Sequence, residues 1–370
     1  MCCLLDAEMS TANATELLET WLSSLEYAVL DWASIIIPPP VIITGIVGNP
    51  LAVGVLLRLP LADSSAARYA VALLVVSTVR LLAEGTMEWF AYATSTKYIM
   101  HKADWICRLW KFLLTTVKGC GAWFVIALAA DRFVYATGKP DAISTVCSSC
   151  VSGVVLVGIV VGVLVVAMHD LWVYGLTIFG NCGVDELPTA DGELNVEAVV
   201  WPWINVFLFD VLPLVVACLI VVPLAVTARR FRQLATIVDG GADSMAMIHA
   251  ALATLIIYIV SVLPTSVFRL TVYYRPPLFV SSRELAAYYS ALTVVSLINC
   301  VQSGTVYVAF FAVVTPMRAA VRAALPKLRR SGINSANTGV QTASAEAHHS
   351  ELEMLDIGRS ADESSIQASR

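Results

Sequence analysis

Seven long apolar segments, separated by short polar ones, dominate the pattern of hydrophobic and polar positions along this chain. They run over residues 33–57, 67–93, 105–136, 146–168, 199–228, 245–272 and 285–314. A helix needs about 20 apolar residues to cross the hydrocarbon core of a bilayer, and barrel strands are much shorter. Inside lipid only helices and closed barrels satisfy their own backbone hydrogen bonds. The pattern therefore predicts an all-α membrane protein, a seven-transmembrane-helix bundle with its termini on opposite sides.

The composition agrees with this prediction. Hydrophobic residues make up 58% of the 370 residues and charged residues only 14%, whereas soluble domains carry about 25% charged residues. Because the spans use most of the chain, we expect one membrane domain over residues 33–314, preceded by a tail over residues 1–32.

A basic segment follows the seventh predicted span. Pro316 suits a first helical turn, and apolar and basic residues then alternate as on a helix that lies in the membrane interface. We therefore expect a short amphipathic helix over residues 315–330; a frayed basic end of the seventh span is the alternative. Residues 331–370 are rich in Ser, Ala, Glu and Gln and poor in aromatic residues, which is typical of a disordered tail.

Basic residues in the short loops predict the orientation, because cytoplasmic loops carry an excess of Lys and Arg. With the N-terminus outside, the three inner loops hold seven basic residues and the carboxyl flank five more, whereas the outer segments hold four: Lys97, Lys102, Arg275 and Arg283. Asn13-Ala14-Thr15 is a glycosylation sequon in the outer tail. We expect a multi-pass protein of the plasma membrane with an extracellular N-terminus and with Asn13 as a glycosylation site.

Besides the charges near the ends of the spans, six charged residues stand out within the predicted spans, where a charge is costly unless it is paired or hydrated. Arg80 and Glu84 are four residues apart and share a helix face. All six can converge on one cavity: Arg80, Glu84, Glu88, Lys118, Asp210 and Arg269. They could form internal ion pairs, and for Arg80 and Glu84 this stays open. We expect ligand contacts at Glu84, Glu88, Lys118, Asp210 and Arg269.

Two cysteines lie on the side predicted to be oxidising, where disulfides persist. Cys107 stands at the outer start of the third span and Cys182 in the second outer loop. A bridge between them would tie that loop across the mouth of the bundle. The chain shows no phosphate-binding glycine loop, no metal-ligand spacing and no nucleophile–base pattern. We therefore expect no enzyme activity, no cofactor, no metal site and no nucleic-acid partner.

Several motifs stand in the order typical of rhodopsin-like (class A) G-protein-coupled receptors. The first span carries Gly48-Asn49, and Asp131-Arg132-Phe133 ends the third. Pro213, Pro264 and Tyr307 stand in the fifth, sixth and seventh spans. From Gly48 through the basic helix, the chain resembles that family. Cys107 lies 25 residues before Arg132, which is the family spacing for the disulfide cysteine.

Residues 105–112 and 169–174 are also similar to invertebrate FMRFamide-like neuropeptide receptors. The resemblance implies an extracellular ligand of peptide type, a heterotrimeric G protein as partner and surrounding membrane lipid. It implies G-protein coupling through Asp131, Arg132, Phe133 and Tyr307. In this reading the Arg132 side chain moves to contact the G protein. Leu114 occupies the position at which the family anchors amines, so an aminergic ligand is disfavoured.

The chain departs from the family at several motif positions. Ser77 replaces the sodium-binding aspartate, and the sixth span reads Ser261-Val262-Leu263-Pro264 without its tryptophan. In the seventh span Asn299 and Ser303 stand at motif positions, and the usual asparagine–proline pair is Ser303-Gly304. Two alternatives stay open: an atypical chemosensory or orphan receptor that signals poorly, and a small transporter. A transporter would carry internal repeats, and the sequence shows no clear repeat.

Overall fold

The computed structural model describes residues 25–58, 64–94, 96, 99–137, 146–177, 180, 182–184, 196–235, 241–274 and 282–313. Within this part of the chain, seven helices are long and apolar enough to cross a membrane. They are Ala28–Leu56, Ser65–Ala93, Asp104–Ala136, Ser149–Val173, Val200–Phe231, Ser244–Val272 and Ala287–Ala312. The prediction of a multi-pass, all-α membrane bundle is confirmed. The expected interfacial helix and the Asn13 sequon lie outside the described residues.

Most spans are built from more than one helical element. The first consists of α2 (Leu25–Ile36) and α3 (Pro38–Leu56), and the second of α4 (Ser65–Arg80), a π-helical turn (Leu81–Thr86) and α5 (Met87–Ala93). A 3-10 turn (Ile99–His101) precedes α6 (Asp104–Ala136), which is the third span. The fourth consists of α8 (Ser149–Ala167) and α9 (Asp170–Val173).

The second half of the bundle follows a short hairpin of β1 (Tyr174–Leu176) and β2 (Cys182–Val184). The fifth span consists of α10 (Val196–Val206), a second π-helical turn (Phe207–Val211) and α11 (Leu212–Ala235). The sixth and seventh are the long helices α12 (Gly241–Tyr274) and α13 (Ser282–Val313).

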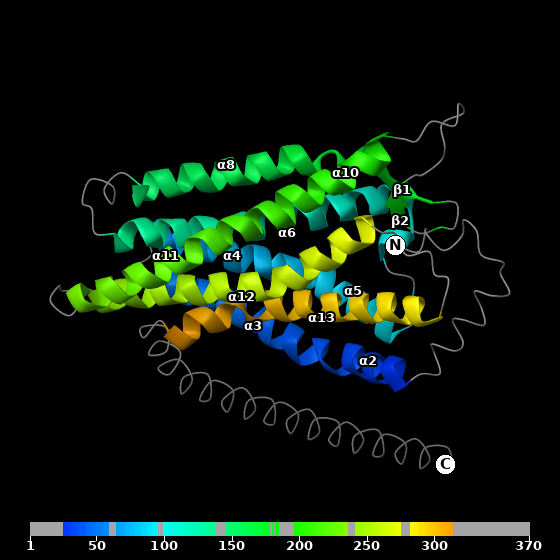
Figure 1. Ribbon diagram of the computed structural model, residues 1–370, viewed down its shortest axis with the longest axis horizontal. Coiled ribbons are helices and arrows are strands. Elements are labelled where there is room, and N and C mark those ends of the chain that lie inside the picture. The colour runs from blue at the N-terminus through cyan, green and yellow to red at the C-terminus, as the bar shows by residue number, and fades with distance from the viewer. Residues whose placement is uncertain are drawn as a thin grey trace, which may run out of the picture. The chain divides into compact units, whose positions relative to one another are not determined.

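Helix α6 is the central element of the bundle, and α8 lies at its edge (Figure 1). The third span packs against α4, α8, α11 and α12, while α13 packs against α3 and α12. The sequence explains the difference between the two helices. Buried positions occur along almost the whole of α6, whereas α8 buries only Ser152, Val163 and Ala167 and turns valines outward.

Small residues allow the first and seventh spans to approach closely. A Cβ atom at Gly45 would lie 2.7 Å from the Cα atom of Gly304, and one at Gly48 would lie 2.7 Å from the ring of Tyr307. Close backbone approach at small residues is how membrane helices gain packing contacts. The side chain of Asn49 then bridges the two helices: its amide donates to the carbonyl of Ser303, and its oxygen accepts from the backbone N–H of Tyr307, both at 3.2 Å.

The two π-helical turns interrupt the second and fifth spans near their middles. In the first, the hydroxyl of Thr86 donates to the carbonyl of Leu81 at 3.0 Å, across five residues. The second turn lies just before Pro213. Because proline has no backbone N–H, it leaves the carbonyl four residues earlier without its helical partner. Each turn contains an acidic residue, Glu84 in one and Asp210 in the other.

A disulfide joins Cys107 of α6 to Cys182 of β2, with the two Cα atoms 5.5 Å apart, so this prediction is confirmed. The hairpin is also tied to the start of α6 by hydrogen bonds. The carboxylate of Asp104 accepts from the backbone N–H of Leu176 at 2.9 Å. The imidazole of His101 accepts from the N–H of Cys182 at 2.7 Å. We call this the disulfide end of the bundle and the opposite one the Arg132 end.

Candidate functional site

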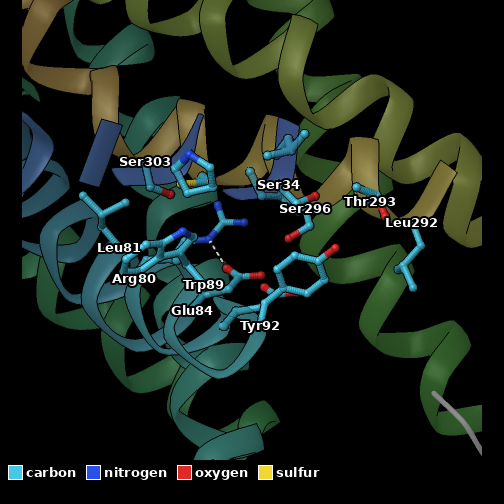
Figure 2. Close-up of a pocket in the computed structure, with 16 residues that line it drawn as sticks. Ser34, Arg80, Leu81, Glu84, Trp89, Tyr92, Leu292, Thr293, Ser296 and Ser303 are labelled. Carbon is cyan, nitrogen blue, oxygen red and sulfur yellow. Dashed lines mark hydrogen bonds and ion pairs between the residues drawn. The ribbon is translucent and has the colours of Figure 1, made fainter. Parts of the chain in front are cut away.

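A cavity of about 150 Å³ lies between the first, second and seventh spans. Two carboxylates, Glu84 and Glu88, and two aromatic side chains, Trp89 and Tyr92, line it from the second span. Figure 2 shows Arg80, Glu84 and Tyr92 facing side chains of α13 such as Ser296 and Thr293. We call this space the glutamate cavity.

The first span supports the rim of the glutamate cavity. The indole N–H of Trp89 donates to the carbonyl of Ile35 at 3.1 Å. The hydroxyl of Tyr92 donates to the carboxylate of Asp31. These bonds hold both aromatic side chains in place beside Glu88, which is itself exposed.

Arg80 and Glu84 form the ion pair that their spacing predicts. Nε of Arg80 lies 2.8 Å from a carboxylate oxygen of Glu84, as the dashed line in Figure 2 marks. The Glu84 side chain is still 29% exposed, against 13% for Arg80. Glu84 therefore keeps surface that faces the cavity, and Arg80 is the one basic residue among those that line it.

A second, smaller cavity of about 40 Å³ lies deeper, among the second, third, fifth, sixth and seventh spans. Ser77, Lys118, Asp210 and Tyr258 line it, so we call it the central cavity. Its volume has room for a few water molecules but not for a peptide. Arg80 lines both cavities, as do Asn299 and Ser303. One cavity was expected for all six charges. Instead Glu84 and Glu88 line the glutamate cavity and Lys118 and Asp210 line the central cavity, while Arg269 lines neither.

Asp210 gathers two cations from other helices. Nζ of Lys118 lies 2.6 Å from one of its carboxylate oxygens, and Nη1 of Arg269 lies 3.3 Å from the other. The Asp210 side chain is 1% exposed, that of Lys118 19% and that of Arg269 38%. A charge this deep is tolerated only when it is paired. The cluster therefore joins the third, fifth and sixth spans.

At the Arg132 end, Asp131 and Arg132 are buried and bonded to each other. Nε of Arg132 lies 2.8 Å and Nη2 2.5 Å from the same oxygen of Asp131. Nη2 also donates to the hydroxyl of Ser65 at 3.2 Å, and the guanidinium lies 4.7 Å from the ring centre of Tyr135. Arg132 is thus held inside the bundle, against the first turn of α4.

Tyr135 extends this cluster to the fifth and sixth spans, which the sequence analysis missed. Its hydroxyl lies 3.0 Å from the hydroxyl of Ser244 on α12, and its ring meets the edge of the Phe231 ring of α11 at 5.8 Å. Tyr135 follows Asp131 by four residues and therefore shares its helix face, which is the sequence signal that could have found it. Together these contacts join the third, fifth and sixth spans at the Arg132 end.

Cys147 lies next to the same cluster, in the segment before the fourth span, which begins at Ser149. Its thiol donates to the backbone carbonyl of Asp131 at 3.6 Å. Burial, followed by the nearby Asp131 carboxylate, raises the pKa of the Cys147 thiol to about 11. This thiol is therefore protonated at neutral pH.

Asp170 is a second buried carboxylate that the sequence analysis passed over. One of its oxygens accepts from the indole N–H of Trp201 at 3.0 Å and from the amide of Asn205 at 3.3 Å. It fixes the start of the fifth span against the end of the fourth. The visible signal was a charged residue that directly follows a long apolar run.

The remaining motif residues have varied surroundings. Ser77 and Pro213 are buried, and Phe133 and Tyr307 are partly buried. Pro264 is exposed on the outer surface of α12.

No known protein-family model matches this chain, and no curated protein matches it either.

Proposed function

We propose that this protein is a receptor of the rhodopsin-like (class A) G-protein-coupled kind. In this proposal it lies in the plasma membrane with its N-terminus outside, binds an extracellular ligand and promotes nucleotide exchange on a heterotrimeric G protein. One observation carries it: the single helix α6 places Lys118 in the charged central cavity and Arg132 in the buried cluster at the opposite end. From Lys118 to Arg132 the helix rises about 21 Å.

The glutamate cavity supports a ligand that carries a cation, such as the amine or guanidinium group of a peptide. Glu84 and Glu88 supply two carboxylates for one Arg80. Trp89 and Tyr92 supply aromatic faces, and cations bind such faces favourably. The cavity holds only a few non-hydrogen atoms, so a peptide would insert one side chain or its terminus and lie with its remainder across the disulfide end.

Signalling would follow from a shift between two packings of the helices, which a ligand drives by binding one of them better. A ligand cation at Glu84 competes with Arg80 for that carboxylate. Because Arg80 also lines the central cavity beside Asp210, its movement changes the charges that hold the third, fifth and sixth spans. At the Arg132 end the Tyr135–Ser244 bond then separates, Arg132 leaves Asp131, and a G protein binds the opened surface. The amphipathic helix over residues 315–330 would border that surface.

The test is nucleotide exchange in purified membranes that contain defined G proteins, with and without pools of cationic peptides. Arg132→Ala should abolish exchange while surface expression and peptide binding stay near wild type. Arg58→Gln, at an exposed basic position at the end of the first span, is the matched control and should leave exchange unchanged. Tags at both ends, probed on intact cells, should reveal only the N-terminal one. Unchanged exchange in Arg132→Ala, or a C-terminal tag exposed outside, would contradict the proposal.

A signalling-poor receptor is the second candidate, and the position of Arg80 favours it. The guanidinium lines the central cavity together with Ser77, Asn299 and Ser303. A cation that belongs to the chain cannot leave the cavity, so it stabilises one packing of the helices more than an exchangeable sodium ion would. Wild-type protein that binds a peptide but activates no class of G protein would favour this reading.

A further inference from the structure

A separate hollow lies on the outer surface of the bundle, between the first, second and fourth spans. Its volume is about 390 Å³. It exists because three small residues form its floor, Ala67 and Ala72 of α4 and Gly153 of α8, whereas Leu57 and Val157 stand exposed at its sides. We call it the Arg68 groove, after the one charged residue among those that line it.

Arg68 lies in the first turn of α4, at the same end of the bundle as Arg132. Its Nη1 donates to the backbone carbonyl of Ser149, the first residue of α8, at 2.8 Å. A guanidinium has five N–H donors in a planar fork. Among the residues that the structure describes, no carboxylate lies within ion-pair distance of Arg68. With respect to these described residues, its charge and most of its donors are therefore available at the mouth of an apolar groove.

The groove is charged at one end and apolar along its length, which is the arrangement that complements a phospholipid. Arg68 and Ser149 lie where two spans begin, at the level of the membrane boundary. Leu156 lines the groove seven residues farther along α8, which corresponds to about 10 Å deeper in the bilayer. A cation at the boundary and an apolar channel below it match a phosphate headgroup and an acyl chain.

We propose that the Arg68 groove binds one anionic phospholipid, with its phosphate on the Arg68 guanidinium and an acyl chain along Ala72, Gly153 and Leu156. Arginine binds phosphate oxygens through two parallel N–H bonds, and an acyl chain suits the apolar channel that continues below the guanidinium. With the N-terminus outside, the groove opens to the cytoplasmic leaflet, which holds the anionic lipids. The proposal does not depend on receptor activity.

The test is native mass spectrometry of the full-length protein with equal amounts of phosphatidylserine and phosphatidylcholine that carry the same acyl chains. Wild type should retain one phosphatidylserine in preference to phosphatidylcholine. Arg68→Gln should weaken phosphatidylserine binding at least about fivefold, as expected for the loss of one basic residue near an anionic surface. Arg68→Lys should keep part of the preference, and Arg230→Gln should keep all of it.

A second pair of variants tests the groove itself. A Cβ atom at Gly153 would lie 3.8 Å from Nη1 of Arg68, and one at Gly54 of α3 would meet nothing within 4 Å. Both positions therefore accept a side chain, but only the one at Gly153 fills the groove. Gly153→Leu should lower retention of the lipid severalfold, whereas Gly54→Leu should not.

Three results would overturn the proposal. The first is equal retention of both lipids by wild type, and the second is unchanged retention in Gly153→Leu. The third is a sterol that occupies the groove irrespective of Arg68. If Arg68→Gln does not fold, as its melting curve would reveal, Arg68→Lys and Gly153→Leu still decide the outcome. None of these results bears on nucleotide exchange, so failure here is distinct from failure of the receptor proposal.

Discussion

Asp210→Asn should destabilise the bundle more than any other single loss of charge in it. The substitution keeps the size of the side chain and removes the negative charge that Lys118 and Arg269 share. At 2.6 Å, and with an effective dielectric constant of about 20, the attraction between Lys118 and Asp210 is about 6 kcal/mol before desolvation. Removing one partner of a buried pair costs about 3–5 kcal/mol, because the other charge stays buried without compensation.

The expected losses differ among the variants because burial differs. Lys118 is 19% exposed and cannot reach water fully, so it carries most of the cost of Asp210→Asn. Lys118→Met should cost less, about 1–3 kcal/mol, because Asp210 keeps Arg269 as a partner. The double variant Asp210→Asn/Lys118→Met should recover part of the lost stability, since it no longer buries an unpaired lysine ammonium. Arg108→Gln is the control: it breaks an exposed pair with Asp104, and such pairs contribute less than about 1 kcal/mol. The glutamine amide keeps a donor for the carbonyl of Leu171, to which Arg108 donates at 3.1 Å.

The assay is thermal unfolding of purified protein, followed by the reaction of buried thiols with a fluorogenic maleimide. Cys120 is buried in the bundle and reacts only when it opens, whereas the exposed Cys150 and Cys218 are blocked beforehand with an unlabelled maleimide. At about 2 °C per kcal/mol, Asp210→Asn should lower the melting temperature by about 6–10 °C and Arg108→Gln by less than about 2 °C. Equal melting temperatures for Asp210→Asn and wild type would refute the claim that this carboxylate is a buried ion-pair partner. If the double variant is less stable than Asp210→Asn, the unpaired Lys118 ammonium is not the main cause of the loss.

Four further outcomes can be checked. Tyr135→Phe removes the bond to Ser244 and should raise basal nucleotide exchange severalfold in membranes, whereas lower exchange would show that this bond belongs to the active packing. Peptide affinity should be nearly equal in sodium and in potassium, because Ser77 offers a hydroxyl and hard cations prefer charged oxygen ligands; a sodium-specific loss of affinity would contradict this. Cys107→Ser should lower the free energy of unfolding by about 2–5 kcal/mol, measured from melting curves, and an unchanged melting point would leave the disulfide without a role in stability. Cys147 should react with iodoacetamide about a hundredfold more slowly at pH 8 than an ordinary thiol, because its pKa of about 11 leaves little thiolate. The rate, measured by peptide mapping after timed labelling, should rise tenfold per pH unit up to that value, and a rate equal to that of an ordinary thiol would contradict this prediction.

The spans could be predicted from the sequence because the bilayer sets their length and polarity. Contacts between residues that are close in sequence could also be predicted, because helix geometry alone places them side by side. Arg80 and Glu84 are four residues apart on a helix, and the structure brings them to 2.8 Å. The disulfide between Cys107 and Cys182 followed from a resemblance and from the side of the membrane.

The pairing of Lys118 with Asp210 was beyond the sequence. The two residues are 92 positions apart, so their meeting depends on how two helices cross and on the rotation of each about its axis. The π-helical turn at Asp210 changes that rotation, and only Pro213 hinted at it. Likewise the bond between Tyr135 and Ser244 depends on the tilt of the sixth span, which hydropathy does not encode. One cavity was therefore expected where packing makes two.

The two π-helical turns have a geometric consequence for each interrupted span. Successive residues of an α-helix advance by 100° around its axis, and a π-helical turn accommodates one residue more than an α-helical turn would. The half of the span nearer the disulfide, α5 in one case and α10 in the other, is thus rotated relative to the half nearer Arg132. In each of these spans, the residues that share a face on one side of the turn therefore do not continue that face on the other side. Substitutions on α5 or α10, near the disulfide, therefore leave the helix contacts at the opposite end of the same span in register.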